Sequence, residues 1–261
     1  YQLAIDDFTR AIKINPDYLD AYNDRGIAYK NLGNYQLAID DYTRAIQINP
    51  DYVKAYYNRG NVYHDLEKYK LAIVDYNRAV IIKPDVARLY INRGNTYSNL
   101  GLTNYAVDDY SRAIKINPDD AMAYYNRGLE YKNLGKYQLA IDDFTRAIKI
   151  NPDDEETYYN RGVTYRNIGK HQLAIDDINN AIRINPNNAI TYYNRGIVFN
   201  DLGNYQNAIN DYTKAIRINP NFAEAYSSRG LAKEKLRKYY CDDYRKACDL
   251  GECDNYNDFC K

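Results

Sequence analysis

The sequence lacks tryptophan and contains one methionine and two histidines in 261 residues. It also lacks any apolar run near the ~20 residues that a membrane-spanning helix needs, which argues against insertion into a bilayer. Neither sign of charge dominates, because 35 basic residues balance 35 acidic ones. This balance argues against a sequence-independent grip on nucleic acid, which needs a basic face, and against a polybasic membrane anchor.

Residue types and motifs typical of catalysis are also scarce. The two histidines, His64 and His171, lie far apart in the sequence. No nucleotide-binding glycine loop, cluster of metal ligands or pair of nucleophile and base is recognisable. We therefore expect no enzymatic activity, no cofactor and no bound metal.

Cysteine is missing from the first 240 residues, after which four occur close together: Cys241, Cys248, Cys253 and Cys260. Such a cluster predicts two disulfide bonds, with a pairing that the sequence leaves open. Buried reduced cysteines and a zinc site are the alternatives, although these spacings lack the close pairs of most zinc sites. Disulfides would indicate a periplasmic or secreted protein, whereas reduced cysteines would fit the cytoplasm.

Proline is confined to seven positions that are each 34 residues from the next, six of them after asparagine and one after Lys83. Glycine keeps the same period, at Gly26, Gly60, Gly94, Gly128, Gly162, Gly196 and Gly230. Two sets of alanines also follow it, beginning at Ala4 and Ala11. A fixed period in this range predicts a stacked solenoid.

Each repeat contains two helical patterns, since its apolar residues fall three and four apart. In one repeat the first pattern ends at Leu134-Gly135 and the second runs from Tyr137 to about Ile150. Asn151-Pro152 stops the second pattern, because proline disfavours helix in the residue before it. The repeat is therefore predicted to be two antiparallel helices that touch at small residues such as Gly128 and Ala140.

These positions resemble the tetratricopeptide repeat. The residues that match its Trp, Gly, Tyr, Ala, Phe, Ala and Pro are Tyr124, Gly128, Tyr131, Ala140, Phe144, Ala147 and Pro152. Tyrosine replaces the family's tryptophan, and arginine replaces the leucine before the glycine. The resemblance, from residue 1 to about 250, implies an all-α fold, a right-handed superhelical solenoid of stacked antiparallel helix pairs.

The resemblance also divides the chain into three parts. Residues 1–18 are expected to be the second helix of a truncated repeat, and residues 19–222 to be six full repeats. Residues 223–261 are expected to be a degenerate C-terminal repeat with a cysteine-containing cap. The chain begins at Tyr1 without methionine or a signal-like stretch, so we expect a fragment or a processed form.

The arginine before each glycine recurs with an aspartate sixteen residues later. The aspartates are Asp41, Asp75, Asp109, Asp143, Asp177 and Asp211. We predict an Arg–Asp pair in each repeat, with the arginine stem packed and its charge neutralised. A basic stripe that binds ligands is the alternative.

Membership of this family implies a concave groove, lined by the first helices, that usually receives a peptide. Two residues before the glycine, five consecutive repeats carry Asn58, Asn92, Asn126, Asn160 and Asn194. This set is similar to the asparagine ladder of the transferases that attach O-linked N-acetylglucosamine, and implies that amide groups bind a peptide backbone. Alternatively, each asparagine bonds its neighbour in the next repeat and sets the superhelix.

Other side chains are expected to line the groove beside this ladder. They are Tyr57, Tyr125, Tyr159, Tyr193, Asn61, Asn95, Lys132 and Arg166. Such a groove suits an extended segment that is polar or mildly acidic. A carboxylate clamp for chaperone tails needs a lysine at the position of Tyr57, and no repeat has one.

We therefore predict a non-catalytic protein–protein interaction scaffold that binds an extended peptide segment in its concave groove. The alternative is a structural repeat protein that polymerises end to end into a fibre or tube, because head-to-tail contacts that do not close make filaments. The predicted partners are a protein or peptide and, in the alternative, other copies of the chain, without nucleic acid or membrane insertion.

Overall fold

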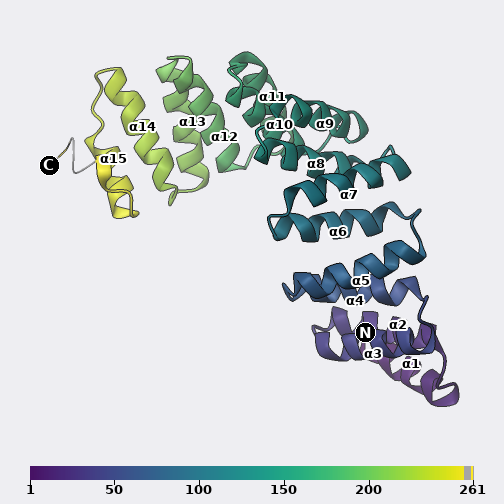
Figure 1. Cartoon of the computed structure of the whole chain (residues 1–261). Coiled ribbons are helices and arrows are strands. Elements are labelled where there is room, and N and C mark those ends of the chain that lie inside the picture. Colours follow the sequence, from purple (N-terminus) through teal and green to yellow (C-terminus); the bar gives the residue numbers. More distant parts are fainter. Residues whose placement is uncertain (256–259, 261) are drawn as a thin grey trace. The chain divides into compact units, whose positions relative to one another are not determined.

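The computed structural model describes residues 1–255 and 260, and within that part of the chain all regular structure is helical (Figure 1). The helices are α1 (Gln2–Ile14), α2 (Leu19–Asn31), α3 (Tyr35–Ile48), α4 (Val53–Asp65), α5 (Tyr69–Ile82), α6 (Ala87–Asn99), α7 (Thr103–Ile116), α8 (Ala121–Asn133), α9 (Tyr137–Ile150), α10 (Glu155–Asn167), α11 (His171–Ile184), α12 (Ala189–Asp201), α13 (Tyr205–Ile218), α14 (Ala223–Lys235) and α15 (Cys241–Asp249). They form two compact units, Tyr1–Glu130 and Tyr131–Lys261.

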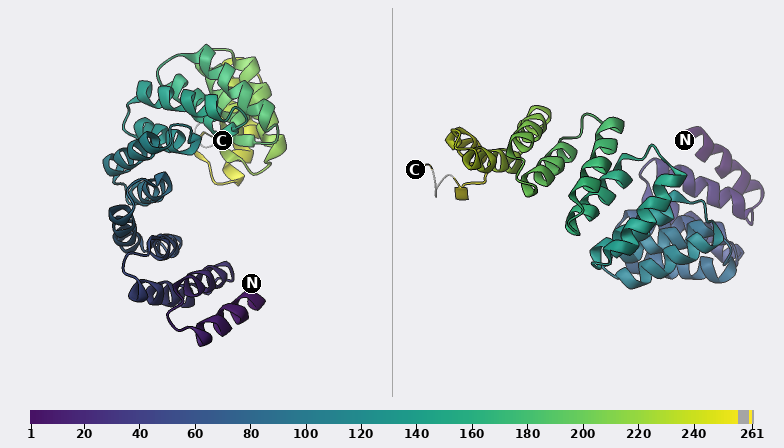
Figure 2. Two further views of the ribbon diagram at one scale, coloured as in Figure 1. Left: turned by 90° about the vertical axis from the view of Figure 1, so that its right-hand side faces the viewer. Right: turned by 90° about the horizontal axis from the view of Figure 1, so that it is seen from above.

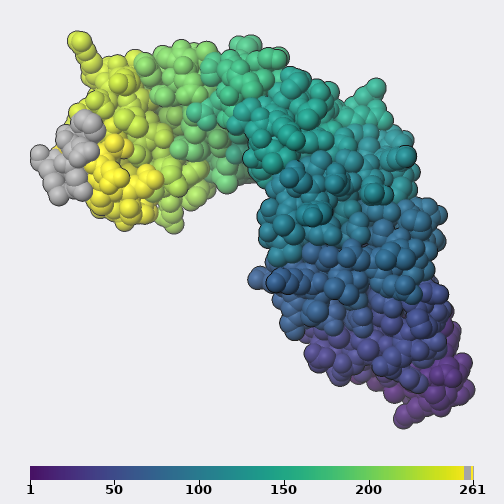
Figure 3. Space-filling view, viewed as in Figure 1, coloured from purple at the N-terminus to yellow at the C-terminus, as the bar shows by residue number. Residues whose placement is uncertain are grey.

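Each unit is a stack of helical hairpins (Figure 2). In the first unit α2 packs on α3, α4 on α5 and α6 on α7, and the hairpins are joined by contacts of α3 with α4 and of α5 with α6. The second unit repeats this arrangement in α10–α11, α12–α13 and α14–α15. First helices also touch one another, α2 with α4 and α4 with α6. Neighbouring hairpins lie in contact over the visible face of each unit (Figure 3). The prediction of an all-α repeat solenoid is confirmed.

The helix ends follow from local backbone chemistry. The second helix of a hairpin stops before Asn-Pro, where Asn49 is extended and its Oδ1 accepts a hydrogen bond from the Asp51 N–H at 3.0 Å. Between the two helices of a hairpin the chain takes a left-handed residue, such as Gly33 with φ +77°. This conformation favours glycine, yet Glu67 and Arg237 adopt it with φ +57° and +54° in the two hairpins that lack that glycine.

A tyrosine ring lies flat against a glycine where the two helices of a hairpin cross. A Cβ at Gly94 would lie 2.7 Å from Cε1 of Tyr110, and Tyr110 itself is buried. Equivalent contacts join Gly26 to Tyr42, Gly60 to Tyr76, Gly196 to Tyr212 and Gly230 to Tyr244. The helices therefore approach as closely as predicted, because no side chain separates the ring from the backbone.

The predicted Arg–Asp pair joins the two helices of a hairpin. Arg59 donates through Nε and Nη2 to the two carboxylate oxygens of Asp75, at 2.8 and 2.7 Å. Its Nη1 donates to Thr43 Oγ1 of the preceding hairpin at 2.8 Å. The rings of Tyr56 and Tyr63 flank the guanidinium, with centroids 5.9 and 6.0 Å from Cζ. The arginine thus binds both hairpins and is half-buried.

The same pair recurs in both units. Its other members are Arg25–Asp41, Arg93–Asp109, Arg161–Asp177, Arg195–Asp211 and Arg229–Asp243. The bond to Asp41 raises the pKa of Arg25. Asp243 follows its arginine by 14 residues instead of 16, because the sequence of the last hairpin is two residues shorter between these two positions. The structural role predicted for these arginines is confirmed.

Gly94→Ala tests the close approach of the helices. The added methyl group would collide with the Tyr110 ring, which the surrounding core prevents from moving. We expect the free energy of unfolding, measured by urea denaturation, to fall by about 1–3 kcal/mol, although alanine favours helix. Asn99→Ala, at an exposed position of the same helix, should change it by less than about 0.5 kcal/mol. Equal effects of the two variants would contradict this packing.

The buried tyrosines predict unfolding at high pH. Burial raises the pKa of the hydroxyls of Tyr42, Tyr76, Tyr110 and Tyr212. The unfolded chain ionises them near pH 10 while the folded chain keeps their protons, so stability falls as pH rises above about 10. Each buried tyrosine lowers the free energy of unfolding by up to about 1.4 kcal/mol per pH unit. Urea midpoints and tyrosinate absorbance measured above pH 10 would show this loss of stability, and a stability that does not change with pH there would contradict it.

Candidate functional site

In the first unit, three predicted ladder asparagines donate hydrogen bonds to the preceding hairpin. Asn58 Nδ2 donates to Asn23 Oδ1 at 2.8 Å, and Asn126 Nδ2 donates to Asn95 Oδ1 at 3.1 Å. Asn92 Nδ2 makes two such bonds, to Asn61 Oδ1 at 2.8 Å and to the Tyr57 hydroxyl at 3.1 Å. The bond between neighbouring hairpins, one of the two alternatives that the sequence left open, is therefore present.

The second unit contains the other two ladder asparagines. Asn194 Nδ2 donates to the Tyr159 hydroxyl at 3.1 Å and to the carbonyl oxygen of Ile190 at 2.9 Å. Asn160 is buried, and its Oδ1 accepts a hydrogen bond from Lys132 Nζ at 2.7 Å. Its Nδ2 donates to the carbonyl oxygen of Glu156 at 3.0 Å. Asn160 is therefore held by protein contacts on both sides of its amide.

Asn92 with Tyr57, and Asn194 with Tyr159, each form one rung of the ladder. Both rungs keep polar atoms that can bind a ligand. Both N–H groups of the Asn92 amide are used, and the same is true of Asn194. Across residues 1–255 and 260, no side chain donates to Oδ1 of either asparagine. The hydroxyls of Tyr57 and Tyr159 accept these bonds, so their own O–H groups remain able to donate. Each rung therefore offers one acceptor and one donor.

Asn61 and Asn95 prove to join hairpins through their side-chain carbonyls. Asn61 Oδ1 accepts from the Tyr76 hydroxyl at 2.7 Å in addition to Asn92, and Asn95 Oδ1 accepts from the Tyr110 hydroxyl at 2.8 Å in addition to Asn126. Sequence reasoning missed these tyrosine partners. A recurring interval of 15 residues between asparagine and tyrosine is the signal that would have found them.

The hairpin α2–α3 lacks such an asparagine. It has Ile27 at the position that Asn61 and Asn95 occupy in the next two hairpins. The buried hydroxyl of Tyr42 accordingly finds no hydrogen-bond partner in the described part of the chain. An asparagine at this position therefore accepts a hydrogen bond from a buried tyrosine as well as one from an asparagine of the next hairpin.

Arg166 and Lys132, the cations that the sequence placed in the groove, are engaged by neighbouring hairpins. Arg166 Nε donates to Asp201 Oδ2 at 2.6 Å, and Lys30 Nζ, at the equivalent position of the first hairpin, lies 2.9 Å from Asp65 Oδ2. Lys132 bonds Asn160, and burial lowers the pKa of this lysine. Instead of unpaired positive charge, these positions carry ion pairs and one half-buried lysine that bonds Asn160.

Hollows lie on the face of the first helices in both units. In the first unit, Asn61, His64, Asn92 and Asn95 line one of about 310 Å³, and Asn95 and Asn126 border another of about 140 Å³. In the second unit, Arg166, Tyr193, Asn200 and Ser228 line one of about 300 Å³. Tyr193 also packs on Phe222, with ring centroids 4.8 Å apart, while Tyr125 lies half-buried on α8. The structure thus brings several predicted groove residues together and buries Asn160 away from solvent.

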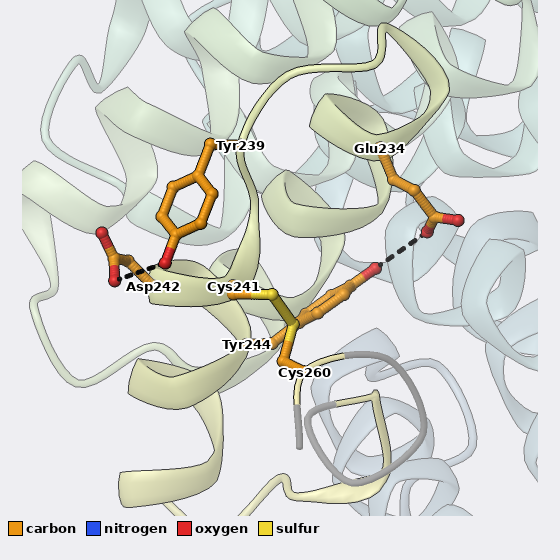
Figure 4. Close-up of a disulfide and its surroundings, with 6 residues drawn as sticks. All are labelled: Glu234, Tyr239, Cys241, Asp242, Tyr244 and Cys260. Carbon is orange, nitrogen blue, oxygen red and sulfur yellow. Dashed lines mark hydrogen bonds between the residues drawn. A yellow bond between two sulfur atoms is a disulfide. The ribbon is translucent and has the colours of Figure 1, made fainter.

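The cysteines form two disulfides, Cys241–Cys260 and Cys248–Cys253, as Figure 4 shows for the first. Disulfide formation is therefore confirmed, and the pairing is decided by the structure. The first bridge joins the start of α15 to Cys260 in the tail. Tyr244 of the same helix points its hydroxyl away from the bridge and donates to Glu234 at 3.3 Å. Residues 256–259 and 261 of the predicted cap lie outside the described residues.

The tail replaces the asparagine of a following hairpin. Asn255 Nδ2 donates to Ser227 Oγ at 2.7 Å. Ser227 occupies the position on α14 that Tyr57 occupies on α4 and Tyr159 on α10, and each of those tyrosines accepts from an asparagine of the next hairpin. The tail therefore makes the bond that a further repeat would make.

Among the described residues, no group of three or more histidine, cysteine, aspartate and glutamate side chains is placed to hold a metal ion. No helix among them has the length and apolar character required to cross a membrane.

Models of the tetratricopeptide repeat match six consecutive segments: residues 19–52, 53–86, 87–120, 121–154, 155–188 and 189–222. A further model, described as a TPR repeat, matches residues 1–33. The chain therefore belongs to the tetratricopeptide repeat family. It is a protein–protein interaction scaffold, built on a fold that is typically non-catalytic. A comparison with curated protein sequences finds no match.

Several solved structures share the fold. YrrB, described as a TPR protein with an unusual peptide-binding site, is 26% identical with a TM-score of 0.60, covering 69% of this chain and 92% of YrrB. A tetratricopeptide repeat protein from Parabacteroides merdae is 22% identical with a TM-score of 0.69, covering 89% and 93%. PilF of Pseudomonas aeruginosa is 18% identical with a TM-score of 0.68, covering 80% and 95%.

Reduction of the disulfides should loosen the last hairpin. The Cys241–Cys260 bridge spans 19 residues and the Cys248–Cys253 bridge spans 5. Loop entropy then predicts losses of about 3 and about 2 kcal/mol respectively when each pair is replaced by serine. Hydrogen exchange of α14 and α15 measures the loss. Unchanged exchange after replacement of Cys241 and Cys260 would contradict a capping role.

Proposed function

We propose that each unit binds an extended peptide along its first helices and holds the peptide backbone by composite rungs. A composite rung is a tyrosine of one hairpin together with the asparagine of the next. The observation that carries the proposal is that the same bond, at 3.1 Å, joins Asn92 to Tyr57 in one unit and Asn194 to Tyr159 in the other.

The chemistry of a rung is complementary to a peptide group. Because both N–H groups of Asn92 are engaged, its Oδ1 accepts from a ligand N–H. Because the Tyr57 hydroxyl accepts from Asn92, its proton donates to a ligand C=O. Each peptide unit presents one donor and one acceptor on its main chain. Recognition of this kind does not depend on the ligand's side chains.

The hydrogen bonds between hairpins also prepare the rung for binding. Tyr57 and Asn92 are half-buried and already bonded to each other, so little side-chain freedom remains to be lost on binding. A net hydrogen bond contributes about 0.5–1.5 kcal/mol, so one rung alone binds weakly. Neighbouring pockets must therefore supply further affinity. The description of YrrB as a peptide-binding TPR protein supports a ligand of this class.

Two modifications test the rungs from opposite sides of the interface. The double variant Tyr57→Phe/Tyr159→Phe removes both hydroxyl donors and keeps the rings. We expect it to weaken binding of a capped, uncharged peptide about tenfold, measured by fluorescence anisotropy with the full chain. N-methylation of single backbone amides in that peptide should weaken binding similarly at the bound positions, because a methyl group replaces the donated hydrogen.

Tyr105→Phe is the matched control, since Tyr105 is 60% exposed on a second helix. It should leave the affinity unchanged. Thermal melts of the variants separate a loss of binding from a loss of stability, because Asn92 and Asn194 also lose a bond in the double variant. Affinity that neither N-methylation nor the double variant changes would exclude recognition of the backbone by these rungs.

A further inference from the structure

A further hollow of the first unit is mainly apolar, unlike the two described above. It has a volume of about 330 Å³ and lies between the N-terminal turns of α4 and α6. Its walls are Val53, Tyr57, Val86 and Leu89, and its rim is Lys54, Lys83 and Arg88. We call it the basic-rimmed pocket. It adjoins the Tyr57–Asn92 rung, because Tyr57 belongs to both.

The sequence departs from its own repeat at the residues that form this pocket. Lys83 stands where the other hairpins have asparagine, and Leu89 where they have alanine or threonine. Five of those asparagines, Asn15, Asn49, Asn117, Asn185 and Asn219, accept a hydrogen bond from the N–H two residues later. A lysine cannot accept that bond. This hairpin therefore gives up a local turn bond and gains a cation at the rim.

Only one of the three rim cations is paired with a carboxylate among the described residues. Lys54 Nζ lies 3.6 Å from Asp20 Oδ1, and that carboxylate also accepts the hydroxyl of Tyr52. Lys83 and Arg88 are exposed, and neither forms an ion pair within the part of the chain that the structure describes. Other hairpins have Asp20, Met122, Glu156, Ile190 and Glu224 at the position of Lys54 and Arg88. Two consecutive cations at this position are thus peculiar to the pocket.

We propose that the basic-rimmed pocket binds an apolar side chain that is flanked by carboxylate side chains in the same extended peptide. This inference rests on the proposed function, since the Tyr57–Asn92 rung would hold the backbone at the pocket's edge. The apolar walls remove the central side chain from water. Lys83 and Arg88 pair with the flanking carboxylates, and a guanidinium can bind a carboxylate through two parallel hydrogen bonds.

Three capped peptides of one length test the pocket with the full chain. Each has the same serine, threonine and glycine background, with Asp-Leu-Glu, Ser-Leu-Ser or Asp-Ala-Glu at the centre. We expect the Asp-Leu-Glu probe to bind about tenfold more tightly than either of the others by fluorescence anisotropy, about 1.4 kcal/mol. Added salt should reduce this preference over Ser-Leu-Ser, because exposed charges are screened.

Substitutions borrowed from other hairpins test the rim without disturbing the repeat. Lys83→Asn restores the residue of the other hairpins, and Arg88→Met introduces the residue found at Met122. The double variant should weaken the Asp-Leu-Glu probe about tenfold and leave the Ser-Leu-Ser probe unchanged. Lys70→Gln is the matched control, because it removes an exposed lysine of α5 and copies Gln36. It should change neither affinity.

The outcomes separate this proposal from the proposed function. Equal binding of all three probes would overturn the proposed specificity of the pocket. The same conclusion would follow if the rim variant bound the Asp-Leu-Glu probe as tightly as the unmodified chain. In either case the effect of N-methylation would still test backbone recognition by the rungs. Sensitivity to the rim variant without sensitivity to N-methylation would support the pocket and overturn backbone recognition. Absence of binding by every probe would overturn both.

Discussion

The half-buried arginine of each hairpin is the interaction on which the rest of the structure depends. It donates to an aspartate on its own second helix and to a side chain of the preceding hairpin, as Arg59 does to Asp75 and Thr43. Aromatic rings on its own helix flank the charge. Loss of one partner would leave a poorly solvated charge, which is strongly destabilising. The arginine therefore fixes the register of one hairpin upon the next.

That register determines what the first helices offer to a ligand. Because neighbouring hairpins pack in a fixed register, the asparagine of one hairpin donates a hydrogen bond to a tyrosine or an asparagine of the hairpin before it. The protein itself uses most of the amide hydrogens, and the lone pairs and hydroxyl protons that remain form the candidate binding face. A scaffold of this kind is rigid where it would contact a ligand, because the same side chains hold the solenoid together.

Hairpins differ in their contacts at positions where the sequence departs from the repeat. Ile27 leaves Tyr42 without a partner, Lys83 and Leu89 create the basic-rimmed pocket, and Asn255 completes the last hairpin from the tail. In a periodic sequence each departure stands beside several unchanged copies. The unchanged hairpins therefore supply matched controls for every substitution, and a difference in binding or stability can be assigned to one position.

The sequence alone determined the hairpins, their period, the Arg–Asp pairs and the presence of disulfides, because each depends on residues close in the chain or on a strict interval. It also located the asparagine ladder, although whether the ladder binds a peptide remains a prediction. Only the tertiary structure decided that Asn92 bonds Tyr57 and which cysteines pair. The bond between Asn92 and Tyr57 depends on how one hairpin is rotated against the next. Packing over the whole interface sets that rotation, and no local pattern encodes it.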